Sequence, residues 1–209
     1  MDEPLLNDDA VVERDAIDAA LYWHEHKKNI LLAVAAVVIF GGGSLAWFVS
    51  STLASRASEE ALAVAKDIPA YESLIKTYPG TMPAADALLL LASAQRDAGK
   101  MEESSATFQS FLKTYPAHPL AGAALLGVGQ NLDASGKPSE AVTTFQQVAE
   151  KYPASYAAPF ARYAQAEILL REFRRAEARA TLESIQGEFP DSFVSRLAAA
   201  QLARLGTAK

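Results

Sequence analysis

The feature that most constrains this chain is an aromatic residue placed directly before a proline at four evenly spaced positions. The pairs are Tyr78-Pro79, Tyr115-Pro116, Tyr152-Pro153 and Phe189-Pro190, and successive prolines stand 37 residues apart. A fixed period between about 20 and 50 residues is typical of stacked repeats, in which each unit covers the apolar face of its neighbour. The sequence therefore predicts three full repeats, at residues 80–116, 117–153 and 154–190.

Aligned on the prolines, the three units share one pattern of small and large apolar residues. The small residues that coincide are Ala92, Gly129 and Ala166, and the large ones are Phe108, Phe145 and Leu182, then Phe111, Val148 and Ile185. The two large positions and the aromatic before the proline lie at i, i+3 and i+7, which is one face of a helix. A small residue on the facing helix allows close helix–helix approach. Each unit is therefore expected to be a pair of packed helices.

The ends of these helices are marked by glycine and proline. The expected first helices span residues 84–98, 121–135 and 158–171, and the second helices span 101–115, 138–152 and 174–189. Gly99 and Gly136 fall between the two helices of their units, where a helix end favours a residue that tolerates positive φ. The closing proline ends each second helix because it lacks an N–H and restricts the residue before it.

This pattern resembles the tetratricopeptide repeat family. The second unit carries the family's small residue (Gly129), its Ala-x-x-x-Phe motif (Ala141 to Phe145) and its closing proline (Pro153). The resemblance implies an all-α solenoid whose first helices line a groove for segments of partner proteins. The groove positions that it implies are Leu89, Ser93, Arg96, Leu126, Gln130, Asp133, Tyr163 and Glu167. The polar members of this set are equally suited to a solvated face that binds nothing.

Residues 29–50 are predicted to form a single transmembrane helix. No side chain between Ile30 and Val49 is ionisable, and a helix of that length reaches about 30 Å, the thickness of a bilayer core. Aromatic residues flank both ends, as they do at membrane interfaces: Tyr22, Trp23, Trp47 and Phe48. The competing interpretations are a cleaved signal peptide, which usually has a shorter apolar core behind a basic leader, and a buried helix, which residues 41–43 (three glycines) would weaken.

The segments beside the predicted span have distinct compositions. Residues 1–28 hold eight acidic and three basic residues and are expected to form an acidic cytosolic tail, because Lys27 and Lys28 abut the membrane edge. The repeats are then expected on the other side of the membrane. Residues 51–79 are predicted to be a helical neck with a partial leading repeat, and residues 191–209 a helix that caps the array.

The sequence offers little material for catalysis. Cysteine is absent. His24 and His26 stand two residues apart and would point to different sides of a helix, so they are expected to be solvated beside the membrane and not to bind a metal. His118 lies in the sequence Ala-His-Pro between two repeats and is expected to be a turn residue. The arginines of the cluster Arg171, Arg174, Arg175 and Arg179 alternate with acids, which favours a solvated face with local ion pairs over a site for an acidic partner. Basic residues form no concentrated nucleic-acid footprint. We expect a protein that is not an enzyme and binds no cofactor, metal or nucleic acid.

The order of tail, span, neck and repeats resembles the family of membrane-anchored ancillary subunits of the bacterial Sec translocon. That resemblance implies a single-pass inner-membrane protein with periplasmic repeats, which contacts lipid through residues 29–50. It also implies partners among the translocon, periplasmic chaperones and unfolded or nascent secreted clients. Residues 152–157 are also similar to the repeats of envelope-assembly and cell-division adaptors of the outer-membrane and Tol–Pal type, which are the alternative. Self-association through the span or the repeats is left open.

Overall fold

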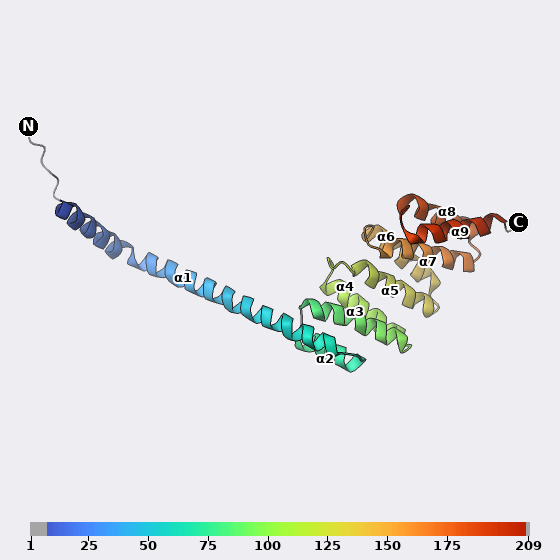
Figure 1. Ribbon diagram of the computed structural model, residues 1–209, viewed down its shortest axis with the longest axis horizontal. Helices are drawn as coiled ribbons and strands as arrows, with labels where there is room; N and C mark the ends of the chain where they lie inside the picture. The colour runs from blue at the N-terminus through green and yellow to red at the C-terminus, as the bar shows by residue number, and fades with distance from the viewer. Residues whose placement is uncertain (1–7, 208–209) are drawn as a thin grey trace, which may run out of the picture. The chain divides into compact units, whose positions relative to one another are not determined.

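The computed structural model of this protein describes residues 8–207, with side chains described at residues 22–29, 31–33, 35–36 and 47–206. Within residues 8–207 all regular secondary structure is α-helical, as the sequence predicts. The helices are α1 (Asp8–Val64), α2 (Ile68–Thr77), α3 (Met82–Asp97), α4 (Met101–Thr114), α5 (Ala121–Ala134), α6 (Pro138–Lys151), α7 (Ala157–Arg171), α8 (Arg175–Glu188) and α9 (Phe193–Thr207) (Figure 1). The chain divides into two compact units, residues 1–53 and 54–209, and all the repeats lie in the second.

Helix α1 contains residues 8–28 of the predicted tail and the predicted membrane span. Its backbone is helical from Asp8 to Val64. Among the residues that the structure describes, no helix combines the length and the apolar character needed to cross a bilayer. The side chains of residues 37–46, the middle of the predicted span, lie outside the described residues, as do those of residues 1–21 of the predicted tail. The membrane helix therefore stays a prediction.

The predicted helix pairs are present, and their ends agree with the expected ones to within two residues. Helices α2, α4, α6 and α8 each end one residue before an aromatic-proline pair, so the proline ends the second helix as predicted. At the start of α3 the hydroxyl of Thr81 accepts a hydrogen bond from the Ala84 amide, and Pro83 occupies the first turn, where a missing N–H costs nothing.

The turn between the two helices of each repeat needs one residue with a left-handed backbone. Gly99 and Gly136 supply it in the first two repeats, with φ of 77° and 74°. Phe173 stands at the same position of the third repeat, with φ of 61° and a side chain that is 86% exposed. Only glycine adopts this conformation without a steric cost, so the third turn is strained where the other two are not.

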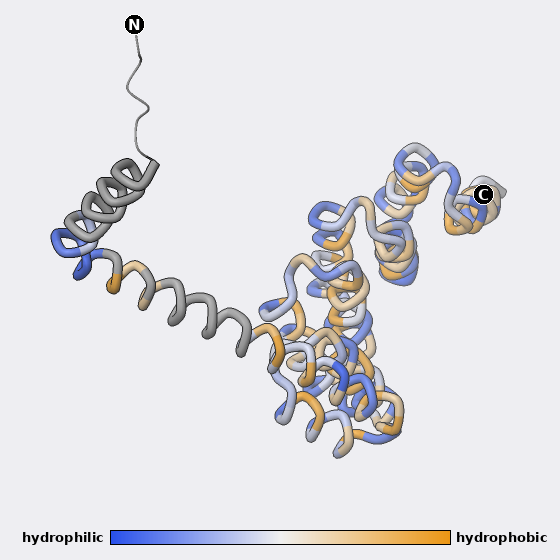
Figure 2. Tube along the Cα trace, turned by 60° about the vertical axis from the view of Figure 1, so that its left-hand side comes forward, coloured by the Kyte–Doolittle hydropathy of each residue, from blue (hydrophilic) through white to orange (hydrophobic). Residues whose placement is uncertain are grey.

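The aligned apolar positions form the core. The small residues Ala92 and Ala166 and the large residues at both aligned columns are buried. Along the helices of the second unit, hydrophobic and hydrophilic residues are interspersed (Figure 2). Gly129 lies so close to the Phe145 ring that a Cβ there would overlap it. The small-residue column therefore lets the aromatic of the second helix pack onto the first helix, as the spacing predicts.

The turns that join consecutive repeats are closed by one aligned side chain each. Thr81, His118, Ser155 and Ser192 occupy equivalent positions. The Ser155 hydroxyl accepts from the Ala157 amide at 3.2 Å, the Ser192 hydroxyl accepts from the Val194 amide at 3.2 Å, and His118 Nδ1 accepts from the Leu120 amide at 3.1 Å. These bonds satisfy amides at the start of a helix that have no partner within it. His118 is thus a turn residue, as expected.

Each helix from α2 to α9 packs against the next one, and the first helices also touch one another, α5 against α7 and α7 against α9. At the leading end, Ala61 and Leu62 of α1 pack with Leu74 of α2. At the trailing end, Val194 and Ala198 of α9 are buried against α8. The second unit is thus an all-α solenoid in which the first helices lie side by side along one face.

Candidate functional site

The face formed by the first helices contains a pocket between α3 and α5. It has a volume of about 290 Å³. Five of the eight predicted groove residues line it: Leu89, Ser93 and Arg96 of α3, and Leu126 and Gln130 of α5. We call this the α3–α5 groove. The leucines come from one aligned column and the polar residues from two others, so the repeat places an apolar strip beside a polar strip. The arrangement suits a chain that presents both apolar side chains and backbone amides.

Within the polar strip of the α3–α5 groove, Arg96 contacts side chains of both helix pairs. Its guanidinium donates a hydrogen bond to the Gln130 side-chain oxygen and lies over the Phe108 ring, 5.5 Å from the ring centre. The hydrogen bond links two neighbouring repeats, and the ring contact is a cation–π interaction. Guanidinium carries five N–H donors, so the bond to Gln130 leaves most of them for a ligand.

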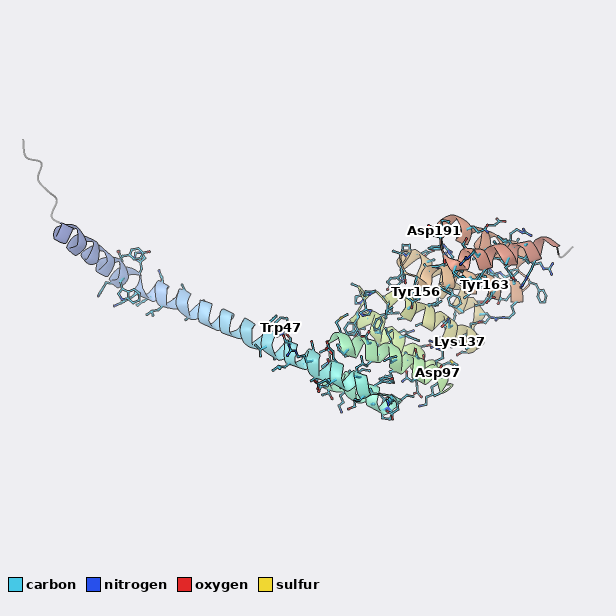
Figure 3. All side chains as sticks on the ribbon, in the orientation of Figure 1. Trp47, Asp97, Lys137, Tyr156, Tyr163 and Asp191 are labelled. Carbon is cyan, nitrogen blue, oxygen red and sulfur yellow. The ribbon has the colours of Figure 1, made fainter. Side chains whose placement is uncertain are left out.

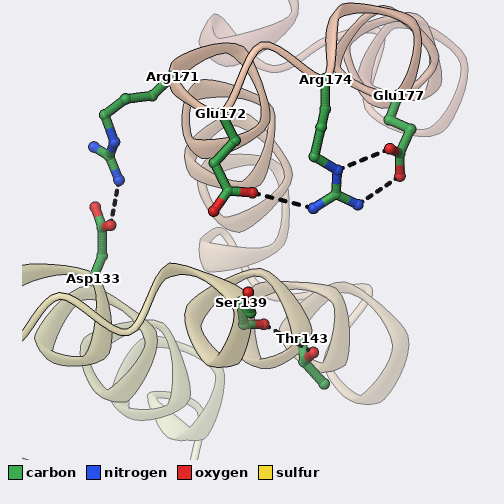
Figure 4. A network of polar contacts seen from close by, with 7 residues as sticks. All are labelled: Asp133, Ser139, Thr143, Arg171, Glu172, Arg174 and Glu177. Atoms are coloured by element: carbon green, nitrogen blue, oxygen red, sulfur yellow. Dashed lines mark hydrogen bonds and ion pairs between the residues drawn. The ribbon is translucent and has the colours of Figure 1, made fainter.

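The other three predicted groove residues lie further along the array and outside this groove. Asp133 forms an ion pair with Arg171 of the next repeat (Figure 4). Tyr163 packs against the last core cluster; burial raises the pKa of its hydroxyl, and the neighbouring Glu167 carboxylate raises that pKa further. The structure thus divides the eight predicted residues between one pocket and separate contacts between side chains, and their role in binding stays a prediction.

Two arginines of the predicted cluster make ion pairs: Arg171 pairs with Asp133 of the preceding repeat, and Arg174 pairs with two nearby glutamates, Glu172 and Glu177. Arg174 donates to both carboxylate oxygens of Glu177, at 2.8 and 2.7 Å, and to Glu172 at 3.2 Å (Figure 4). These hydrogen bonds lower the pKa of the Glu177 carboxyl and raise that of the guanidinium. With Arg171 on Asp133 and Arg174 on two glutamates, these two side chains are already neutralised by the protein.

A second pocket, which the sequence reasoning missed, lies where the last two inter-repeat turns meet. Residues 153–156, 159–160 and 188–193 line a space of about 520 Å³. Tyr156 is shared by this pocket and the α3–α5 groove. A signal for it existed, because Met82, Pro119, Tyr156 and Phe193 form an aligned column of apolar residues at exposed turns. We call it the turn pocket.

The paired helices, the 37-residue period and the groove along the first helices define a helical-repeat solenoid. Residues 86–118, 123–155 and 160–192 match the tetratricopeptide repeat family. This part of the chain therefore consists of three tetratricopeptide repeats, and the sequence-based resemblance to that family is confirmed.

Solved structures show the same fold. A tetratricopeptide repeat protein from Parabacteroides merdae superposes with a TM-score of 0.54 at 17% sequence identity, over 75% of this chain and 60% of that one. This chain thus spans less than two thirds of that protein's length. A comparison with curated protein sequences found no match.

Proposed function

We propose that this protein is a scaffold whose α3–α5 groove binds an extended segment of a partner protein. The observation that carries the proposal is the apolar strip of Leu89 and Leu126 beside the donors and acceptors of Ser93, Arg96 and Gln130. Alternate side chains of an extended peptide would pack on the leucines, while its carbonyls accept hydrogen bonds from Arg96. Tetratricopeptide arrays form extended surfaces of this kind, and the role proposed for this one is non-catalytic.

We further propose that residues 29–50 tether the scaffold to a membrane. The support is the absence of ionisable side chains from Ile30 to Val49 and the aromatic residues at both ends. The tether would belong to the bacterial inner membrane, with residues 1–28 in the cytosol and the repeats in the periplasm. Partners would then be the Sec translocon, periplasmic chaperones or unfolded secreted clients. The second candidate is an adaptor for outer-membrane assembly or for cell division of the Tol–Pal type.

The groove can be tested by filling it. Gln130 is exposed on the groove floor, so Gln130→Trp should fill the groove without disturbing the core. Gln146→Trp places the same ring at an exposed position of the second helix α6 and is the matched control. Partners recovered by photo-crosslinking from native membranes should be lost with Gln130→Trp and retained with the control. Equal recovery from both variants would contradict binding in the α3–α5 groove.

The tether and its sidedness need a separate measurement. Protease added to sealed inner-membrane vesicles of known orientation should degrade either residues 1–28 or residues 54–209, but not both. Release of the whole chain by carbonate washing would contradict a membrane span. The identity of the crosslinked partners, translocon and chaperones or else division and outer-membrane factors, decides between the two candidate roles.

A further inference from the structure

The turn pocket combines exposed aromatic rings with carboxylates. Tyr156, Phe160 and Phe193 keep 60%, 45% and 58% of their surface exposed although all three line the same pocket (Figure 3 labels Tyr156 and Asp191). Single exposed apolar side chains are ordinary on protein surfaces, but several gathered in one hollow indicate an interaction site. The protein therefore keeps a set of ring faces open to solvent at the junction of its last two turns.

The charged side chains that line the turn pocket are all acidic. Glu188 and Asp191 line it, and the lining contains no lysine or arginine. Asp191 takes part in no hydrogen bond or ion pair with the described residues, and Glu188 has a single long contact with Arg162, at 3.6 Å. Both carboxylates can therefore accept a charged donor.

One ring of the turn pocket already makes a cation–π contact with an arginine of the protein. The guanidinium of Arg196 lies 5.3 Å from the centre of the Phe193 ring, although Arg196 is not part of the pocket lining. Aromatic faces attract ammonium and guanidinium groups through the ring quadrupole. Rings on one side and carboxylates on the other are complementary to a long side chain with an apolar stem and a cationic head.

We infer that the turn pocket binds a lysine or arginine side chain of the partner segment that occupies the α3–α5 groove. The stem packs on Tyr156 and Phe160, and the charged head meets Asp191 and Glu188. Because Tyr156 lines both the pocket and the groove, a continuous extended segment can enter both. This inference rests on the proposed function, since it assigns a basic residue to one end of the same ligand.

The experiment compares peptides that differ in one charge. Fluorescein-labelled peptides of a Leu/Ser host sequence carry lysine, glutamine or glutamate at either end, and fluorescence anisotropy measures their affinity for the full-length protein in detergent. The lysine peptide should bind about five- to tenfold more tightly than the glutamine peptide, because an exposed ion pair and a cation–π contact are each modest. The glutamate peptide should bind least, and added salt should reduce the lysine preference.

Three variants separate the possible outcomes. Asp191→Asn should reduce the preference for the lysine peptide over the glutamine peptide, because only Glu188 and the rings then remain in the pocket, whereas Glu183→Gln, which removes an exposed charge from helix α8 away from the pocket, should change nothing. Gln130→Trp should weaken all peptides. Equal affinity for lysine and glutamine peptides, with both sensitive to Gln130→Trp, would overturn the pocket and leave the groove intact. Peptide affinities that Gln130→Trp leaves undiminished, with the lysine preference intact, would support the pocket and overturn the groove, and absence of all binding would overturn both.

Discussion

Replacing Phe173 by glycine tests whether the third repeat stores strain that the other two avoid. Phe173 occupies the left-handed turn position at which Gly99 and Gly136 stand in the first two repeats. A residue with a Cβ pays about 1–2 kcal/mol for this conformation. Glycine removes that cost but gives the unfolded chain more freedom, which costs about 0.5–1 kcal/mol. Because the ring is 86% exposed, little packing is lost, and Phe173→Gly should stabilise the protein by about 0.5–1 kcal/mol.

The assay is thermal unfolding of the full-length chain followed by circular dichroism, together with hydrogen exchange of α7 and α8. A stabilisation of this size should raise the midpoint of thermal unfolding by about 1–4 °C for a chain of this length. Hydrogen exchange is needed because repeat arrays unfold in part near one unit before the rest. Protection should increase in the third repeat and stay unchanged in the first.

The matched control introduces backbone strain at a turn that has none and should therefore lower the stability. Gly136→Ala places a Cβ at the equivalent turn of the second repeat, where φ is 74° and nothing lies within 4 Å of the new atom. It should destabilise by about 0.5–1 kcal/mol through backbone strain alone. If Gly136→Ala has this cost and Phe173→Gly still fails to stabilise, backbone strain at Phe173 does not decide the stability of this turn, and the phenyl ring must make a compensating contact.

Three further predictions concern individual contacts. His118→Ala should cost about 1 kcal/mol in urea unfolding because the turn loses its amide acceptor, whereas His118→Ser restores the residue type of the other turns and should cost less. Gly129→Ala should be destabilising because it overlaps the Phe145 ring, and Phe145→Leu should rescue it by at least about 0.5 kcal/mol in a double-mutant cycle. Glu177 should titrate below its ordinary value of 4.5 in an NMR pH titration, because the folded state favours the carboxylate that Arg174 holds. Its contribution to stability is therefore complete above the ordinary value and lost as pH falls through the lowered one, and Arg174→Ala should return its pKa toward 4.5.

The periodic part of the fold could be predicted from the sequence because the constraint repeats. An apolar residue at one position is weak evidence, but the same class of residue at a fixed interval in three units identifies a buried column, and the proline limits each helix end. Helix ends and core positions were therefore predicted closely. The middle of the predicted membrane helix is a single, non-repeated stretch whose side chains lie outside the described residues, so it remains a prediction.

The polar pairing in the groove face could not be predicted because it does not keep the 37-residue period. Arg96 meets Gln130 at a separation of 34 residues, and Asp133 meets Arg171 at 38. An alignment on the 37-residue period compares equivalent positions, whereas these side chains pair at separations that differ from the period. The alignment therefore does not reveal the pairs. The turn pocket could not be predicted for a related reason. Its rings come from the adjoining ends of consecutive repeats, and the column of Tyr156 and Phe193 holds methionine and proline in the earlier units.

The third repeat departs most from the shared pattern, and it is the one that borders the turn pocket. Arg162 and Gln165 stand in columns that hold leucine or valine in the other units, and Arg162 Nε and the Gln165 side-chain oxygen are buried without a partner among the described residues. Buried polar groups of this kind cost stability. The backbone strain at Phe173 adds to that cost within the same unit. The second repeat also buries one polar atom without a partner among the described residues, Asn131 Oδ1, but its turn has no strained residue. Departures from local rules are expected where function opposes packing, and Arg162 reaches Glu188, one of the two pocket carboxylates. These departures at the C-terminal end of the array agree with the ligand binding that we propose for the turn pocket.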